Sequence, residues 1–222
     1  MLFTFILYCN QIFPKWANTL PIIVLIVLVI TLGLVVHLFW YWLSPKHLNV
    51  GYQPKQPIPF SHALHVENVG LDCRYCHSNV EKAAHSNIPA TETCMNCHKQ
   101  IKTDSPHIKK LTKHYENNEP IEWVKVHMLP DYVYFNHAAH TTAGVSCVQC
   151  HGQVNKMDVV YQAKPLSMGW CLECHREPEK FIWPKEKITD LNWRPTNQIN
   201  LGLQLKETYN VNPGEACSVC HR

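Results

Sequence analysis

Charged side chains are scarce in this chain of 222 residues, of which only 17% are Asp, Glu, Lys or Arg. The scarcity is greatest between Trp16 and Pro45, a stretch that contains none of these four residue types. Long periodic stretches are also few, so the sequence does not indicate an ordinary side-chain core. The absence of charge indicates a segment that is compatible with a membrane. The lack of periodic stretches indicates that something other than regular side-chain packing forms the core.

The uncharged stretch predicts a transmembrane anchor over residues 16–45. Its thirty residues would extend about 45 Å as a helix, more than the hydrocarbon layer of about 30 Å. We expect a spanning helix from near Thr19 to Leu43, with an aromatic belt at residues 39–42. A cleaved signal peptide is the alternative, but the stretch is too long for its apolar region and has no small-residue cleavage pattern. Residues 1–15 would then form an interfacial segment.

Ten of the eleven cysteines occur in five copies of one pattern, C-x-x-C-H. We number the copies motifs 1 to 5 in chain order. They consist of Cys73, Cys76 and His77 (motif 1); Cys94, Cys97 and His98 (motif 2); Cys147, Cys150 and His151 (motif 3); Cys171, Cys174 and His175 (motif 4); and Cys217, Cys220 and His221 (motif 5). The remaining cysteine, Cys9, is expected to be a free structural thiol.

Three chemistries use a C-x-x-C pair. A thioredoxin-like dithiol needs one copy in a βαβ unit, and zinc ribbons do not require a His after every second Cys. Attachment of c-type haem does require it, because the two thiols add to the porphyrin vinyl groups while the adjacent His binds the iron. The motifs therefore predict five covalently bound c-type haems, with zinc sites or disulfides as the alternatives.

Haem attachment explains the missing side-chain core. Five haems in residues 73–222 leave little room for a core of side chains. We therefore expect a mainly α fold with much irregular coil, packed around porphyrin. This domain would comprise residues 46–222. Thioether attachment takes place outside the cytoplasm, which places this domain on the periplasmic side of a bacterial cytoplasmic membrane. The formal charge of +3 does not indicate nucleic-acid binding, because the haems would add about ten propionate groups.

An internal duplication includes the first four haem motifs. Repeat units at residues 58–100 and 133–177 each contain F-x-H-x-x-H followed by two motifs. Between them lies a connector that is expected to be helical and solvated, with a docking surface for an acidic redox partner as one interpretation of its lysines. We expect residues 176–216 to form an extended strap, so that residues 178–222 comprise the strap and motif 5.

The second axial ligand decides whether a haem only carries electrons or has an open site for catalysis. The repeated histidines are the main candidates for this distal position: His62 for motif 1 and His137 for motif 3, with His65 and His140 one helical turn later. For motif 2 we expect His85, which lies between motifs 1 and 2.

Other side chains compete for the distal positions. His127 is a further imidazole candidate, whereas the second repeat has no counterpart of His85 and contains Met157 and Met168 instead. Because a thioether raises the reduction potential, we expect a His/Met haem, at motif 4, with mere packing against porphyrin as the alternative. His37, inside the uncharged stretch, is expected to be a neutral interfacial residue, with a quinol site as the alternative.

The repeats resemble the class III multihaem cytochromes c, the c3 and c7 group. VGYQPKQPIPFSHALH, LDCRYCHSNVEKAAHSNIP, LPDYVYFNHAAH and LSMGWCLECHR, together with one N-terminal span, resemble the membrane-anchored pentahaem cytochrome c subunit of alternative complex III. The resemblance is strong from about Gly51 to Cys174 and weaker over the tail. It implies an electron-carrier subunit, not itself an enzyme, that relays electrons from a quinol-oxidising complex to a cytochrome c, another carrier or a terminal oxidase. Its implied partners are polytopic quinol-binding subunits, an iron–sulfur subunit and a monohaem cytochrome c.

Two other functions compete with the electron relay. An anchored multihaem quinol dehydrogenase that feeds periplasmic reductases is the principal alternative. A multihaem enzyme such as a nitrite reductase would need a C-x-x-C-K motif or a haem without a distal ligand, and all five motifs here end in His.

Overall fold

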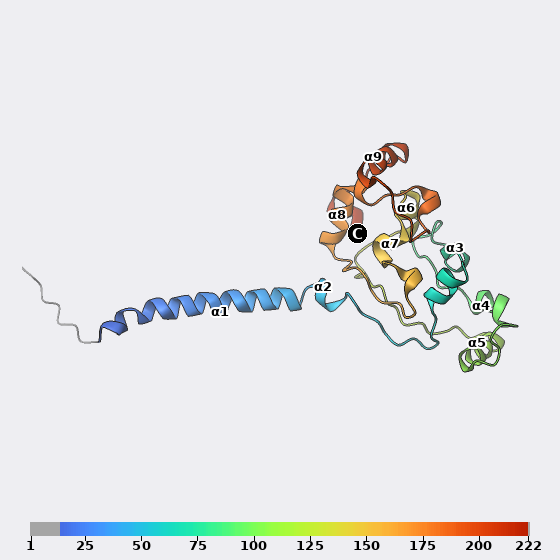
Figure 1. Ribbon diagram of the computed structural model, residues 1–222, viewed down its shortest axis with the longest axis horizontal. Helices are drawn as coiled ribbons and strands as arrows, with labels where there is room; N and C mark the ends of the chain where they lie inside the picture. The colour runs from blue at the N-terminus through green and yellow to red at the C-terminus, as the bar shows by residue number, and fades with distance from the viewer. Residues whose placement is uncertain (1–13, 222) are drawn as a thin grey trace, which may run out of the picture. The chain divides into compact units, whose positions relative to one another are not determined.

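The computed structural model describes residues 14–221 and divides into two compact units, with the boundary between Leu48 and Asn49 (Figure 1). Within the described residues the regular elements are helices, joined by coil and by two isolated β-bridges. The expectation of a mainly α fold with much coil is therefore confirmed. The expected interfacial segment, apart from residues 14 and 15, and Cys9 lie outside the described residues.

The first unit contains η1 (Lys15–Asn18), the long helix α1 (Leu20–Trp42) and the short α2 (Pro45–Leu48). The 23 residues of α1 correspond to about 35 Å of helix, which is long enough to cross a bilayer. All of its side chains are exposed, as an anchor requires. The helix begins next to Thr19, as expected, and tolerates a proline in its first turn.

The second unit carries all five motifs, each beginning or contained in a short helix. Its elements are η2 (Ala63–Asn68), α3 (Cys73–Cys76), α4 (Thr91–His98), α5 (Pro106–Glu116), α6 (His137–Thr142), α7 (Cys147–His151), η3 (Val154–Lys156), α8 (Met168–Arg176), η4 (Pro178–Lys180), η5 (Lys185–Lys187), α9 (Gln198–Thr208) and α10 (Cys217–Cys220). In a helical turn two residues three positions apart lie on the same face. Helicity therefore turns both cysteines of each motif to one side.

The two repeats pack against each other through backbone hydrogen bonds. The amide of His137 donates to the Ala84 carbonyl (3.1 Å) and that of Ala138 to the Ala83 carbonyl (3.2 Å). The start of the second repeat is thus fixed to the loop between motifs 1 and 2.

The segment expected to be an extended strap is instead partly helical, containing η4, η5 and the eleven-residue α9. Helix α9 begins at Asn197, whose side chain accepts a hydrogen bond from the amide of Asn200. Gly202 allows α9 to lie directly on η4, because a Cβ there would overlap the Glu179 backbone. The segment also buries Ile182 and Trp183, so it is a packed part of the unit rather than a loose wrapping.

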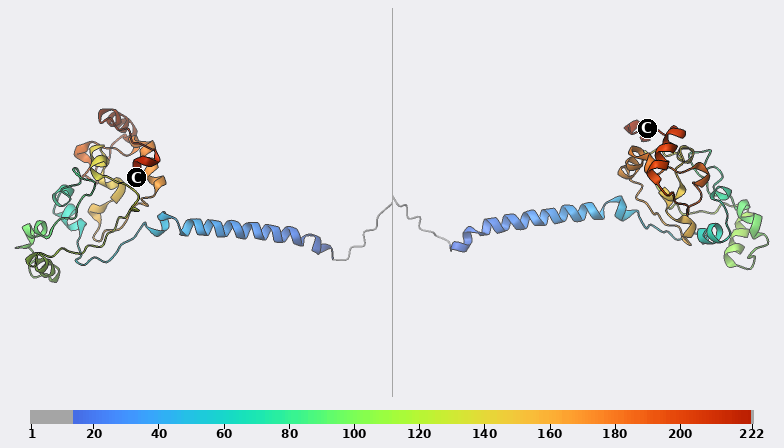
Figure 2. Two further views of the ribbon diagram at one scale, coloured as in Figure 1. Left: turned by 180° about the vertical axis from the view of Figure 1, so that it is seen from behind. Right: turned by 45° about the horizontal axis from the view of Figure 1, so that its top comes forward.

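The connector is helical over α5, as expected. Figures 1 and 2 show α4 and α5 together at one end of the second unit, whereas α8, α9 and the C-terminal residues lie at the other end. The five motifs lie between or at these two ends.

Candidate functional site

The motif helices contact one another in a definite order. Motifs 1 and 2 are joined by a hydrogen bond in which the Asn96 amide donates to the Tyr75 hydroxyl (3.1 Å). Motifs 1 and 3 are joined where the thiols of Cys73 and Cys147 lie close enough together that the pKa of Cys73 is lowered and that of Cys147 is raised. Motif 1 therefore lies between motifs 2 and 3.

The order continues through the second repeat. The Cys150 thiol is close enough to those of Cys171 and Cys174 to raise its pKa electrostatically, although burial is the larger cause of a rise to about 12. Cys171 is in turn close to Cys220. The motifs thus form a series 2–1–3–4–5.

Solvent exposure agrees with this series. Cys97 in motif 2 and Cys217 in motif 5 are exposed, whereas the other eight motif cysteines are half-buried. The two exposed cysteines belong to the two ends of the series.

At three of the motifs the imidazole of the motif histidine lies about 6 Å from a second imidazole. An iron bound on both sides by imidazole nitrogens at about 2 Å would hold the two ring centres roughly 6 Å apart. The three ring-centre separations are 6.1 Å for His65 and His98, 6.4 Å for His137 and His151, and 6.3 Å for His140 and His175. Each pair joins a repeated histidine to a motif histidine at the separation that one iron requires.

His62 lies near the motif histidine of motif 1. Burial, followed by the nearby imidazoles of His77 and His65, lowers the pKa of His62 to about 4. The imidazole is therefore neutral at pH 7, as metal ligation demands. Its buried Nδ1 has no hydrogen-bond partner, which is the unsatisfied polar atom that an additional group in the site would explain.

Most of these histidines are oriented by a backbone carbonyl. Donation from Nδ1 fixes the tautomer and leaves the Nε2 lone pair free for a metal. The acceptors are the carbonyls of Asn87 for His77, Ile101 for His98, Gly214 for His175, Tyr132 for His221, Ser61 for His65, Ala84 for His137 and Asn136 for His140, at 2.7–3.2 Å. This donor set fits haem iron.

Two distal expectations differ from the observed arrangement. His85, expected at motif 2, is exposed, and His65 occupies the place opposite His98 because the helical turn η2 directs it there. At motif 4 the structure places His140, rather than a methionine, opposite His175. Met168 is 67% exposed and Met157 is buried, so the side chain that the structure places opposite His175 is an imidazole, and a His/Met pair at motif 4 stays a prediction.

The remaining candidate, His127, lies beside motif 3. Its ring centre is 4.4 Å from that of His151, too close for one iron between them, and its buried Nε2 has no hydrogen-bond partner. The ring contact of His221 in motif 5 is with Tyr132, at 5.7 Å. Within residues 14–221, motif 5 thus differs from motifs 2, 3 and 4 in facing a phenol ring rather than an imidazole.

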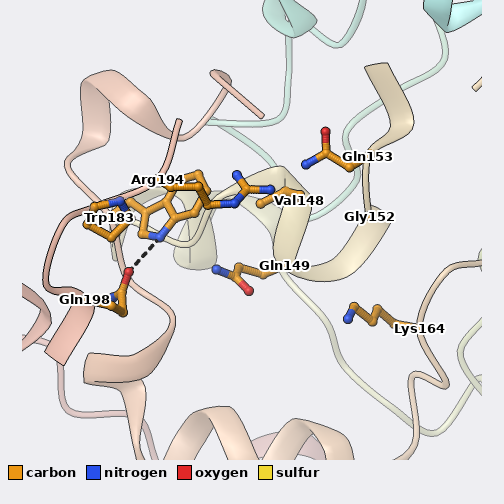
Figure 3. Close-up of a pocket in the computed structure, with 9 residues that line it drawn as sticks. Val148, Gln149, Gly152, Gln153, Lys164, Trp183, Arg194 and Gln198 are labelled. Atoms are coloured by element: carbon orange, nitrogen blue, oxygen red, sulfur yellow. Dashed lines mark hydrogen bonds between the residues drawn. The ribbon is translucent and has the colours of Figure 1, made fainter. Parts of the chain in front are cut away.

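A cavity of about 520 Å³ opens beside α7 (Figure 3). Trp183 forms one side, where its indole donates a hydrogen bond to Gln198 (3.0 Å) and Arg194 lies over its ring. Lys164 lines the same cavity and is near Cys150. An apolar wall next to two cationic side chains suits a porphyrin with propionate groups.

The orienting carbonyls are functional groups that sequence reasoning missed. Every residue has a carbonyl, so nothing in the sequence singles out Ala84 or Gly214. Asn87 is a partial exception. Its φ is 55°, a positive value that Asn adopts more readily than most other residues apart from Gly. That local preference turns its carbonyl toward His77.

Comparison with known proteins agrees with this site. The family described as cytochrome c7 and related cytochrome c matches residues 58–118 and 133–222, which include both repeats and all five motifs. The chain is also 30% identical over 200 residues, or 86% of its length and 87% of the relative's, to the menaquinone reductase, multiheme cytochrome c subunit, of Nitratidesulfovibrio vulgaris. The chain therefore belongs to the family of cytochrome c7 and related cytochromes c, whose members bind haem covalently.

Proposed function

We propose that this chain is the pentahaem electron-relay subunit of a quinol-oxidising membrane complex of the alternative complex III type. The observation that carries the proposal is the unbroken series of five C-x-x-C-H motifs, three of them with a second imidazole at about 6 Å. In this proposal the ten motif cysteines attach five haems, and His77, His98, His151, His175 and His221 are the proximal ligands.

The distal ligands in this proposal come from the two F-x-H-x-x-H segments. His62 serves motif 1, His65 motif 2, His137 motif 3 and His140 motif 4. For motif 5, His127 remains the candidate, because His85 is exposed. When bound, haem supplies reversible one-electron oxidation and reduction, and the protein tunes each potential by ligand, burial and hydrogen bonding.

The proposed anchor determines where in the cell the chain would lie. Helix α1 would cross the cytoplasmic membrane once and hold residues 46–222 on the periplasmic side. Polytopic quinol-binding subunits, an iron–sulfur subunit and a monohaem cytochrome c are the proposed partners, with a terminal oxidase as a further acceptor. The name of the relative supports a complex that interacts with menaquinone.

That name also supports a second candidate function, in which electrons move toward menaquinone rather than away from quinol. The same motifs could serve either direction, since outer-sphere transfer is reversible. The partner subunits and the potentials decide between the two directions.

Reduction of the purified complex by a menaquinol analogue, followed by haem absorbance, tests the proposal. We expect rapid haem reduction in the complex and none in the isolated chain. Reduction of the isolated chain would instead identify a single-chain quinol dehydrogenase. Slow reduction by menaquinol, with rapid oxidation of reduced haem by menaquinone, would favour the second candidate.

A further inference from the structure

One end of the second unit carries a group of lysines on α5 and the turn before it. Residues 99–113 contain five lysines and one acidic residue, Asp104. We call the five the lysine surface: Lys99, Lys102, Lys109, Lys110 and Lys113. All five are exposed.

The lysine surface is fixed to the end of the series at motif 2. The opposite face of α5 packs Leu111 against Ile58 and Met95, and Cys94 of motif 2 lies against the same cluster. Lys110 also donates a hydrogen bond to the Pro57 carbonyl (3.0 Å). The positive charges are therefore held next to the motif whose Cys97 is exposed.

The five lysines form no ion pairs within the described residues. The six ion pairs formed by residues 14–221 use Arg74, Arg176, Lys180, Lys187 and Lys206. None of the five surface lysines takes part in them. A group of like charges that form no ion pairs within the protein favours association with an oppositely charged partner.

The other end of the series has a different surface. Near motifs 4 and 5 the exposed side chains include Tyr132 (65% exposed), Met168 (67%) and Val219 (43%). Apolar surface suits a permanent subunit contact, whereas a charged surface suits a transient encounter that must form and separate quickly. The two ends are therefore suited to different kinds of partner.

We propose that the lysine surface docks a soluble electron-carrier protein with an acidic surface, which exchanges electrons at motif 2. This inference rests on the proposed relay function and names the partner for one end of it. Anionic lipid headgroups offer the same charge, but a lipid surface would not use the exposed haem-attachment cysteine beside the lysines. A carrier protein explains both features.

The test measures the oxidation of the reduced, detergent-solubilised full-length holoprotein by two monohaem cytochromes c, one acidic and one basic. The test variant is Lys109→Glu/Lys113→Glu, because these two lysines lie one helical turn apart and neither side chain makes a hydrogen bond that holds α5. The control variant is Lys82→Glu/Lys156→Glu, which changes the charge equally at exposed positions outside α5. The milder Lys109→Gln/Lys113→Gln variant guards against misfolding.

We expect the acidic cytochrome to react faster than the basic one at low ionic strength, and added salt to slow it. Its rate constant should fall at least about tenfold in the Glu variant and less in the Gln variant, and should change by less than about twofold in the control. An unchanged rate in the Glu variant, or an equal loss in the control, would overturn the proposal. So would loss of binding to phosphatidylglycerol vesicles while the cytochrome rate persists, since that outcome identifies lipid as the occupant.

A small oxidant separates failure of docking from failure of the relay. Tris(phenanthroline)cobalt(III) needs no protein docking surface and should oxidise every haem in all variants. If it does so while the Glu variant keeps the wild-type rate with the acidic cytochrome, docking alone is wrong. If it leaves haems reduced in the wild-type protein, the relay function is wrong as well.

Discussion

Individual imidazoles carry most of the functional information in this chain. Burial and neighbouring imidazoles lower the pKa of His151 to about 3, and carbonyl acceptors orient seven of the other motif and repeat histidines. A neutral imidazole with a fixed tautomer binds metal without first losing a proton or rotating. Ligand choice at each motif should therefore be sensitive to single substitutions.

Replacing His137 by Met should raise one midpoint potential. A thioether stabilises reduced iron relative to an imidazole, and a rise of roughly 0.1–0.3 V would be a fraction of the ≈ 0.8 V range set by axial ligands. Spectroelectrochemical titration of the holoprotein measures this change. His85→Met is the matched control and should leave all potentials unchanged; a shift in the control but not in the test variant would contradict the assignment.

His140→Ala should open one iron to external ligands. The loss of the imidazole opposite His175 should convert about one haem per chain to a high-spin form that binds carbon monoxide when reduced. Electron paramagnetic resonance and carbon monoxide difference spectra measure the two effects. Met168→Leu should show neither effect, and carbon monoxide binding in that variant would restore methionine as a ligand at motif 4.

At the scale of elements, short helices position the ligands, and contacts between segments that are far apart in the sequence hold those helices in place. Sequence spacing was sufficient to predict α1, the helical connector and the location of the motif cysteines. It did not predict α9, because the few apolar residues of 198–208 show no clear helical period and its stability comes from packing on η4. The position of His65 rather than His85 opposite His98 likewise depends on where η2 lies, which spacing alone cannot specify.

The contact between α9 and η4 is testable at Gly202. A Cβ in Gly202→Ala would overlap the Glu179 backbone, so we expect a loss of about 1–3 kcal/mol in the free energy of unfolding. Gly169→Ala in α8 is the matched control, since nothing lies within 4 Å of its added Cβ. Urea unfolding of the holoprotein, followed by circular dichroism, should show equal or higher stability for the control; equal destabilisation of both variants would contradict the packing described here.

At the scale of the whole molecule, the chain consists of an apolar helix, the proposed anchor, followed by a series of motifs with two distinct ends. The sequence contained the number of motifs and the duplication, but not their order in space. The series 2–1–3–4–5 arises because the second repeat packs on the loop between motifs 1 and 2. Motif 1 therefore contacts motif 3, and motif 2 is left at an end.

Removal of residues 1–48, with an export signal supplied, should leave a soluble periplasmic haem protein. The division of the structure at Leu48 implies that residues 49–222 keep their own contacts, while the apolar α1 provides membrane attachment. Fractionation and visible spectra of the truncated protein should show it in the soluble fraction with the haem content of the full chain. Persistent membrane association would point to a second attachment surface, and loss of haem would show that the two units depend on each other.

The central claim is that every C-x-x-C-H motif of this chain holds a covalently attached haem. Mass spectrometry of the intact chain under denaturing conditions tests it most directly, because thioether bonds survive conditions that remove non-covalent groups. The account predicts the mass of the polypeptide plus five haems. A mature chain with four or fewer would contradict it.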